Sequence, residues 1–114
     1  MTPPIHKNLA QGRWHLMSVS EQLANVGSEF ERAASAHARG DHERFDKAFE
    51  RMLELLDDLT IADPRWRKRR RLRELVRLRE EVCDVFFGND TYGTPIEDLK
   101  RYFLYFAIAA RANR

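Results

Sequence analysis

Helix-start signals divide this chain into four segments, and they constrain its fold more than any other feature. Each signal places a side chain that accepts backbone hydrogen bonds just before an acid or a proline in the first helical turn. The signals lie at Ser18–Glu21, Asp41, Asp63–Pro64 and Thr94–Glu97. They predict four helices over about 18–39, 42–60, 64–87 and 95–112.

Apolar residues recur at helical spacing within each segment, so each helix has a face for a core. In the first segment the spacing alternates between four and three residues from Val19 to Ala33 and continues to His37. With short loops between the segments, this pattern predicts an all-α, antiparallel four-helix bundle over residues 18–114. Residues 1–17 would form an N-terminal arm. We expect His37, on the seam, to be a hydrogen-bonded core histidine.

The last segment has apolar residues on two opposite sides. Leu104, Tyr105 and Ile108 lie roughly opposite the side that carries Leu99 and Phe103. A bundle of this size would leave these three bulky side chains in water. We therefore expect a homo-oligomer whose interface contains Leu104, Tyr105 and Ile108. The alternative is that the N-terminal arm covers them.

Composition narrows the class of protein. The 43% hydrophobic and 33% charged residues suit a folded helical protein, and no run of about eighteen apolar residues suggests a membrane span. The single cysteine, Cys83, cannot form an internal disulfide, which favours a reducing compartment. We expect a cytoplasmic protein without a membrane partner.

Charge is concentrated in one stretch, "RWRKRRRLRELVRLR", at residues 65–79. It carries a net charge of +8, whereas the rest of the chain carries −6. Arginines outnumber lysines there, which favours bidentate contacts to phosphate or carboxylate. The nucleic-acid-binding residues predicted from this stretch are Arg65, Arg67, Lys68, Arg69, Arg70, Arg71 and Arg73.

Protein carboxylates are the alternative partners for these arginines. Asp57, Asp58 and Asp63 lie just before the stretch and could neutralise it. Arg79 is a separate case because it lies within the apolar arc of its helix and needs a partner if buried. Glu29 and Glu54 are candidates for that pair.

Signals for catalysis are few. The four histidines form no E-x-x-H pair, so we expect no di-iron site, no other metal site and no cofactor. Arg32 and His37 form an R-x4-H pattern, which resembles the ribonuclease motif of the HEPN family of small helical bundles. That resemblance implies an arginine and a histidine acting together on a scissile phosphate, although Ala33 stands where those proteins usually have a polar residue.

Three segments, "RWHLMSVSEQLANVGSEFERA", "LTIADPRW" and "YFLYFAIAARAN", together resemble a family of small bacterial and archaeal helical proteins. That resemblance implies no activity. In architecture alone, the chain also resembles the accessory variability proteins of diversity-generating retroelements, which are oligomeric bundles that bind RNA and a reverse transcriptase. We therefore expect a non-enzymatic accessory protein. Its partner would be RNA or DNA, or an enzyme that acts on nucleic acid. A HEPN-like ribonuclease and a purely structural assembly protein remain alternatives.

Overall fold

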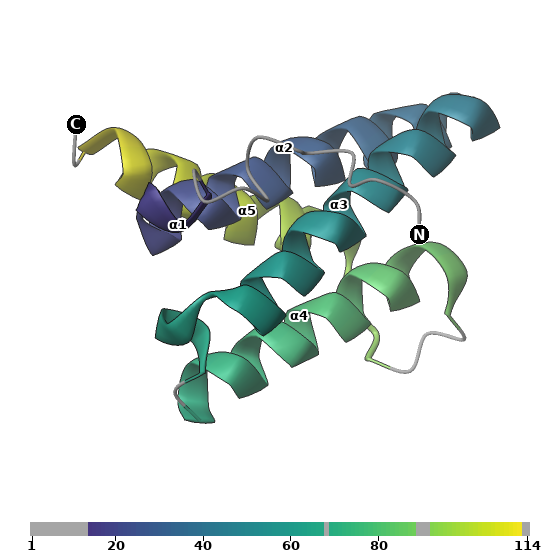
Figure 1. Ribbon diagram of the computed structural model, residues 1–114. Coiled ribbons are helices and arrows are strands. Elements are labelled where there is room, and N and C mark those ends of the chain that lie inside the picture. The colour runs from purple at the N-terminus through teal and green to yellow at the C-terminus, as the bar shows by residue number, and fades with distance from the viewer. Residues whose placement is uncertain (1–13, 68, 89–91, 113–114) are drawn as a thin grey trace, which may run out of the picture.

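The computed structural model describes residues 14–67, 69–88 and 92–112, and every regular element in these ranges is helical (Figure 1). The elements are α1 (Trp14–Leu16), α2 (Val19–Ala38), α3 (His42–Ala62), the 3₁₀ turn η2 (Pro64–Trp66), α4 (Arg69–Phe87) and α5 (Ile96–Ala112). The all-α prediction with four long helices is therefore confirmed for this part of the chain. Of the expected N-terminal arm, residues 1–13 lie outside the described residues.

The helix starts follow the capping signals closely. The Ser18 hydroxyl accepts a hydrogen bond from the Glu21 backbone N–H at 3.1 Å, and the Glu21 carboxylate accepts one from the Ser18 N–H at 3.2 Å. The Asp41 carboxylate accepts a hydrogen bond from the Arg44 N–H at the start of α3. Gly40 has φ of 71°, a conformation that glycine adopts without strain, and this allows the tight connection between α2 and α3.

The prediction of one continuous helix over 64–87 is wrong at its start. The chain instead forms the short turn η2, and α4 begins only at Arg69. Asp63 is extended, as a residue before proline prefers, and its carboxylate holds the Arg65 N–H at 2.9 Å. Trp66 turns into the core, and adjacent cations at a helix N-terminus oppose its dipole. These constraints delay the helix by one turn.

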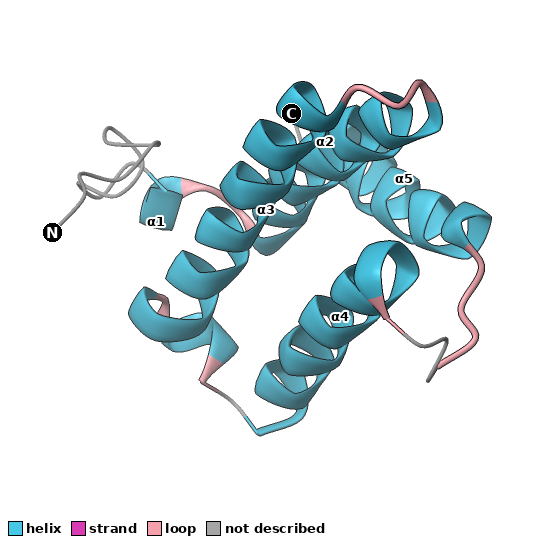
Figure 2. Cartoon of the chain, turned by 90° about the vertical axis from the view of Figure 1, so that its right-hand side faces the viewer, coloured by secondary structure: helices cyan, strands magenta, loops and turns pink. Residues whose placement is uncertain are grey.

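Helix α2 is central to the core, because it packs along α3 on one side and along α5 on the other (Figures 1 and 2). The contact with α5 is close at Gly27, where an added Cβ would lie 2.6 Å from the Cβ of Phe103. The buried core is otherwise aliphatic and aromatic: Trp14, Leu23, Val26, Phe30, Met52, Leu55, Leu56, Leu59, Trp66, Leu75, Leu78, Val82, Leu99 and Phe103.

Helix α4 contributes three buried hydrophobic side chains to the core. They are Leu75, Leu78 and Val82, whereas Val76 is exposed. The half-buried Phe86 reaches α2 through its ring, 5.7 Å from that of Phe30. Among the long helices, α3 is the one whose backbone lies closest to that of α4.

Candidate nucleic-acid interface

The seven basic residues of the predicted interface do not share one environment. Arg65 belongs to η2, Arg67 follows it, and the side chains of Arg70, Arg71 and Arg73 are exposed on the first turns of α4. Lys68 lies outside the described residues. Arg69 begins α4, and its side chain also lies outside the described part.

Arg65 is bound to a protein carboxylate. Its Nη2 lies 2.6 Å from Oδ2 of Asp63, whose side chain is only 2% exposed. The Arg65 hydrogen bond lowers the pKa of the Asp63 carboxyl well below its usual range, although burial opposes this shift. The same hydrogen bond raises the pKa of Arg65. The alternative of pairing with protein carboxylates is therefore confirmed at Arg65.

A buried amide completes the junction between α3 and η2, which is formed around Asp63. The side-chain nitrogen of Gln22 donates to Asp63 Oδ2 at 2.9 Å and to the Trp14 carbonyl at 3.0 Å. Its side-chain oxygen accepts from the indole N–H of Trp66 at 3.0 Å. Gln22 thus joins α1, α2 and η2, and it fixes the point from which α4 departs.

The exposed arginines of α4 have no such partner. Arg70, Arg71 and Arg73 make no ion pair with any residue that the structure describes. Glu74, four residues after Arg70, accepts a hydrogen bond from the Tyr102 hydroxyl at 2.8 Å. Further along α4, Arg77 Nε lies 3.3 Å from Oε1 of Glu81.

The acids of α4 contact α5 and the segment before it. Tyr102 binds Glu74, Tyr92 binds Glu80, and the Thr94 hydroxyl donates to Glu81 at 3.2 Å. Burial and the Glu74 hydrogen bond raise the pKa of Tyr102. These hydrogen bonds hold the three glutamates toward α5 and the segment before it.

The predicted partners of Arg79 are wrong. Arg79 Nε lies 2.9 Å from Oδ1 of Asp57, and both side chains are half-exposed. Glu29, one of the two candidates, instead accepts from Arg32 at 2.7 Å. Arg79 therefore connects α4 to α3 at the surface, and this pair engages Asp57, one of the carboxylates expected to neutralise the arginine stretch.

The prediction of a buried His37 is also wrong. His37 is exposed, with its ring 5.5 Å from that of Phe45 and 5.4 Å from that of Phe86. It lies one residue before the end of α2, past the part of the helix that packs in the main core. Arg32 projects from α2 at about 140° from His37, since successive helical residues are rotated by about 100°. The pair therefore does not converge on one phosphate position.

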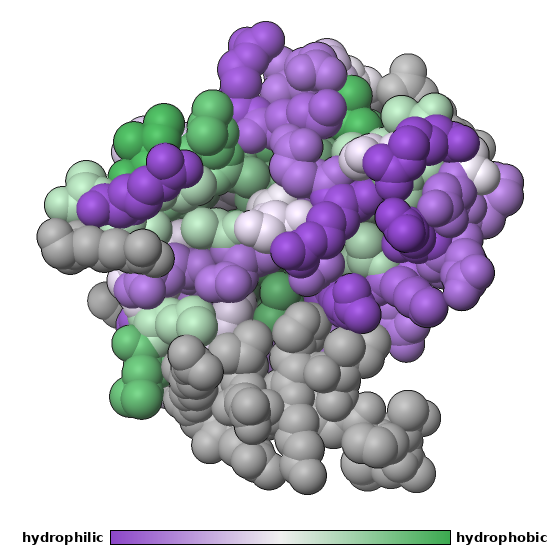
Figure 3. Space-filling model, turned by 90° about the horizontal axis from the view of Figure 1, so that it is seen from above, coloured by the Kyte–Doolittle hydropathy of each residue, from purple (hydrophilic) through white to green (hydrophobic). Residues whose placement is uncertain are grey.

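The expected second apolar side of α5 is present. Leu104, Tyr105 and Ile108 are 53%, 68% and 57% exposed. Figure 3 shows hydrophobic groups at the surface mainly on the left of the molecule, the side on which Figure 1 places the end of α5. Among the described residues, nothing covers this side of the helix.

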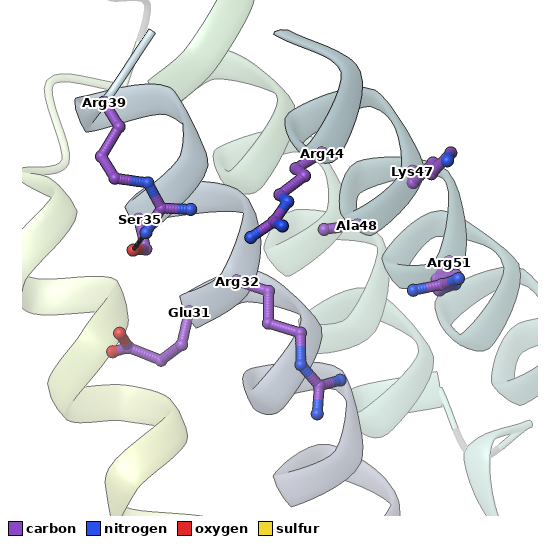
Figure 4. A pocket seen from close by; sticks show the side chains of 8 residues that line it. All are labelled: Glu31, Arg32, Ser35, Arg39, Arg44, Lys47, Ala48 and Arg51. Carbon is purple, nitrogen blue, oxygen red and sulfur yellow. Dashed lines mark hydrogen bonds between the residues drawn. The ribbon is translucent and has the colours of Figure 1, made fainter. Parts of the chain in front are cut away.

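The sequence reading missed a second group of cations. They line a groove between α2 and α3, together with Ser35, Glu31 and Ala48 (Figure 4). The cations are Arg32, Arg39, Arg44, Lys47 and Arg51. The signal was present in the sequence, because positions 32, 35 and 39 and positions 44, 47 and 51 share the same spacing on either side of Gly40.

Comparisons with family models, with curated proteins and with solved structures gave no match. In the described part of the chain, no three histidine, cysteine or acidic side chains are grouped so that they could hold a metal ion. None of the described helices has the length and apolar character needed to cross a membrane.

Proposed function

We propose that this protein is a non-enzymatic, homo-oligomeric, antiparallel helical bundle that binds nucleic acid through the start of α4. The partner is RNA or DNA, alone or in a nucleoprotein such as a reverse transcriptase–RNA complex. The supporting observation is the exposure of Arg70, Arg71 and Arg73 without a carboxylate partner among the described residues.

Contacts with the phosphate backbone would account for binding. Arginine can hold a phosphate through two parallel N–H donors, and such contacts carry little sequence information. Arg70 and Arg73 are three residues apart, as are Arg67 and Arg70 in sequence, so several side chains can follow one strand. Arg65 is excluded from this role because Asp63 engages its guanidinium.

Self-association through α5 would increase this binding. A second copy adds a second arginine surface, and two linked weak contacts give a higher overall affinity than either alone. The exposed apolar side of α5 supports this part of the proposal, because three large side chains in water favour burial against another chain.

The test is the salt dependence of binding to a short single-stranded RNA, measured by fluorescence anisotropy. With four phosphate contacts, from Arg67, Arg70, Arg71 and Arg73, log K should fall with log salt with a slope of about −3. Replacing Arg70 and Arg73 by glutamine should roughly halve this slope.

Arg77→Gln is the matched control, since Arg77 is an exposed arginine of α4 that already pairs with Glu81. It should leave both the affinity and the slope unchanged. An RNA affinity that hardly changes between low and moderate salt would contradict the proposal.

A further inference from the structure

Two rows of cations face one groove between α2 and α3. In each row the positions are separated by three and then four residues, which places their side chains on one side of the helix. The first row consists of the cations Arg32 and Arg39 with Ser35 between them, on α2 and its C-cap. The second consists of Arg44, Lys47 and Arg51 on α3. The most hydrophilic surface in Figure 3 lies on the right, the side where Figure 1 places the α2–α3 connection.

The groove has the dimensions of a small-ligand site. Its volume is 710 Å³, within the range of about 300–1,000 Å³ usual for such sites. The buried Ala48 lies in its lining, and its short side chain leaves room between the helices. Figure 4 shows the guanidinium groups of Arg39 and Arg44 extending from the two helices toward the same space.

Ion pairs within each helix neutralise only part of this charge. Arg32 binds Glu29 at 2.7 Å, Arg44 lies 3.5 Å from Asp41, and Lys47 lies 3.3 Å from Glu43. Glu31 is the one acid in the lining.

Two cations of the groove lack a carboxylate partner. The Arg39 guanidinium donates to the Ser35 hydroxyl at 2.8 Å, and Arg51 has no ion pair with any described residue. No ion pair between described residues crosses the groove from α2 to α3. The facing cations therefore repel one another, and an anion between them would remove that repulsion.

The lining also indicates which part of a ligand would be recognised. It contains five cations and a hydroxyl but no aromatic ring on which a base could stack. Arginine donors match the oxygen atoms of phosphate, and several cations in two rows suit several linked phosphates. A single phosphate would engage only part of the rows.

We propose that the groove between α2 and α3 binds a compact polyphosphate anion, either free or as the phosphate chain of a nucleotide. Arg39 and Arg44 hold it from opposite sides, and Arg51 and Lys47 extend the site along α3. This site is separate from the start of α4, because Arg51 and Asp63 are twelve residues apart on α3 and its cap, about 18 Å along the helix.

Isothermal titration calorimetry with inorganic tripolyphosphate at physiological salt tests this inference. The expected result is saturable binding that weakens about tenfold or more when Arg39 and Arg44 are both replaced by glutamine. The matched control replaces Arg77 of α4 and Arg101 of α5, two exposed arginines outside the groove, by glutamine and should leave tripolyphosphate binding unchanged. Circular dichroism would confirm that both double variants remain helical.

Three outcomes would overturn the inference: no saturable binding of tripolyphosphate, equal weakening by both double variants, or binding of ATP without binding of tripolyphosphate. Similar affinities for ATP and tripolyphosphate would support recognition of the phosphate chain alone. RNA binding by the Arg39 and Arg44 double variant separates the two proposals, because RNA binding at the start of α4 does not use those two residues.

Discussion

At the scale of single residues, the position of α4 depends on one buried amide. Gln22 uses its oxygen and its nitrogen to bind Trp66, Asp63 and the Trp14 carbonyl. A buried polar side chain contributes to stability only when its hydrogen bonds are satisfied, and both polar atoms of the Gln22 amide have partners. The exposed arginines of α4 therefore follow a turn that is held by buried hydrogen bonds.

The Asp63 carboxyl makes the stability of this junction dependent on pH. Its pKa is lowered in the folded protein, chiefly by the Arg65 hydrogen bond. The stabilisation is complete above the ordinary pKa of about 3.9 and is lost as the pH falls toward the lowered value. We predict that the difference in unfolding free energy between the wild type and Asp63→Asn is larger at pH 6 than at pH 2.5.

Urea unfolding at the two pH values measures this difference. Asp46→Asn is the control, since Asp46 is exposed on α3. A difference that stays constant with pH would contradict the prediction.

The hydrogen-bond partners of some residues could be predicted from the sequence, whereas the environments of others could not. The Ser18 capping box could be read from sequence because it requires only two residues three positions apart. The environment of His37 could not be predicted. Periodicity shows which side of a helix faces the core, but not how far the core extends along that helix. The partner of Arg79 depends in the same way on how α4 lies against α3.

At the scale of elements, the packing of α2 against α5 depends on Gly27. Replacing a helical glycine by alanine in an open position usually stabilises a helix by about 1 kcal/mol. At Gly27 the new methyl group would lie 2.6 Å from Phe103 Cβ, so α5 would have to move. We predict that Gly27→Ala lowers the free energy of unfolding by about 1–3 kcal/mol.

Chemical denaturation gives this value, with Ser28→Ala as the control at the next, exposed position. The sign of the change in unfolding free energy is decisive. An increase would show that α2 and α5 are not in close contact at Gly27.

The outer side of α5 gives a second prediction at this scale. Ile108→Glu places a charge in the exposed apolar side that the proposed oligomer buries. A buried unpaired charge is strongly unfavourable, so this variant should shift the molar mass from light scattering toward that of one chain.

Val76→Glu is the matched control, since Val76 is an exposed apolar residue of α4. It should leave the molar mass unchanged. If Ile108→Glu and the wild type have the same molar mass, the α5 interface is wrong.

The element boundaries show where capping rules succeed. Ser18 and Asp41 begin helices as expected because their partners are local. Asp63 also carries a valid start signal, but it begins a 3₁₀ turn, since Trp66 and Gln22 draw the chain inward. That contact joins residues more than forty positions apart, and no local rule includes it.

At the scale of the whole molecule, α4 is much less buried than α2. Its buried side chains among the described residues are Leu75, Leu78 and Val82, whereas nine residues of α2 are buried. We predict from this difference that backbone amides in the middle of α4 exchange with deuterium faster than those in the middle of α2. Hydrogen exchange followed by NMR measures this, and equal protection in both helices would mean that α4 opens only with the whole fold.

Of the two positively charged surfaces of the molecule, only one could be predicted from the sequence. The arginine stretch was evident because its residues are adjacent in sequence. The groove was not, because its two rows form one surface only when α2 and α3 are rotated so that Ser35 and Ala48 face the same space. Helix spacing defines each row, and the rotation follows from packing around Ala33, Ala36 and Ala48.

The hydrogen bond between Trp66 and Gln22 also gives the molecule an optical property. The chain has two tryptophans, Trp14 and Trp66, and both are buried around the same glutamine. Its intrinsic fluorescence therefore comes from the junction at which α4 departs from the core. A ligand that tilts α4 would change the emission, whereas one held in the distant groove would leave the spectrum unaltered. Binding that tilts α4 could thus be followed without attaching a dye and distinguished from binding in the groove.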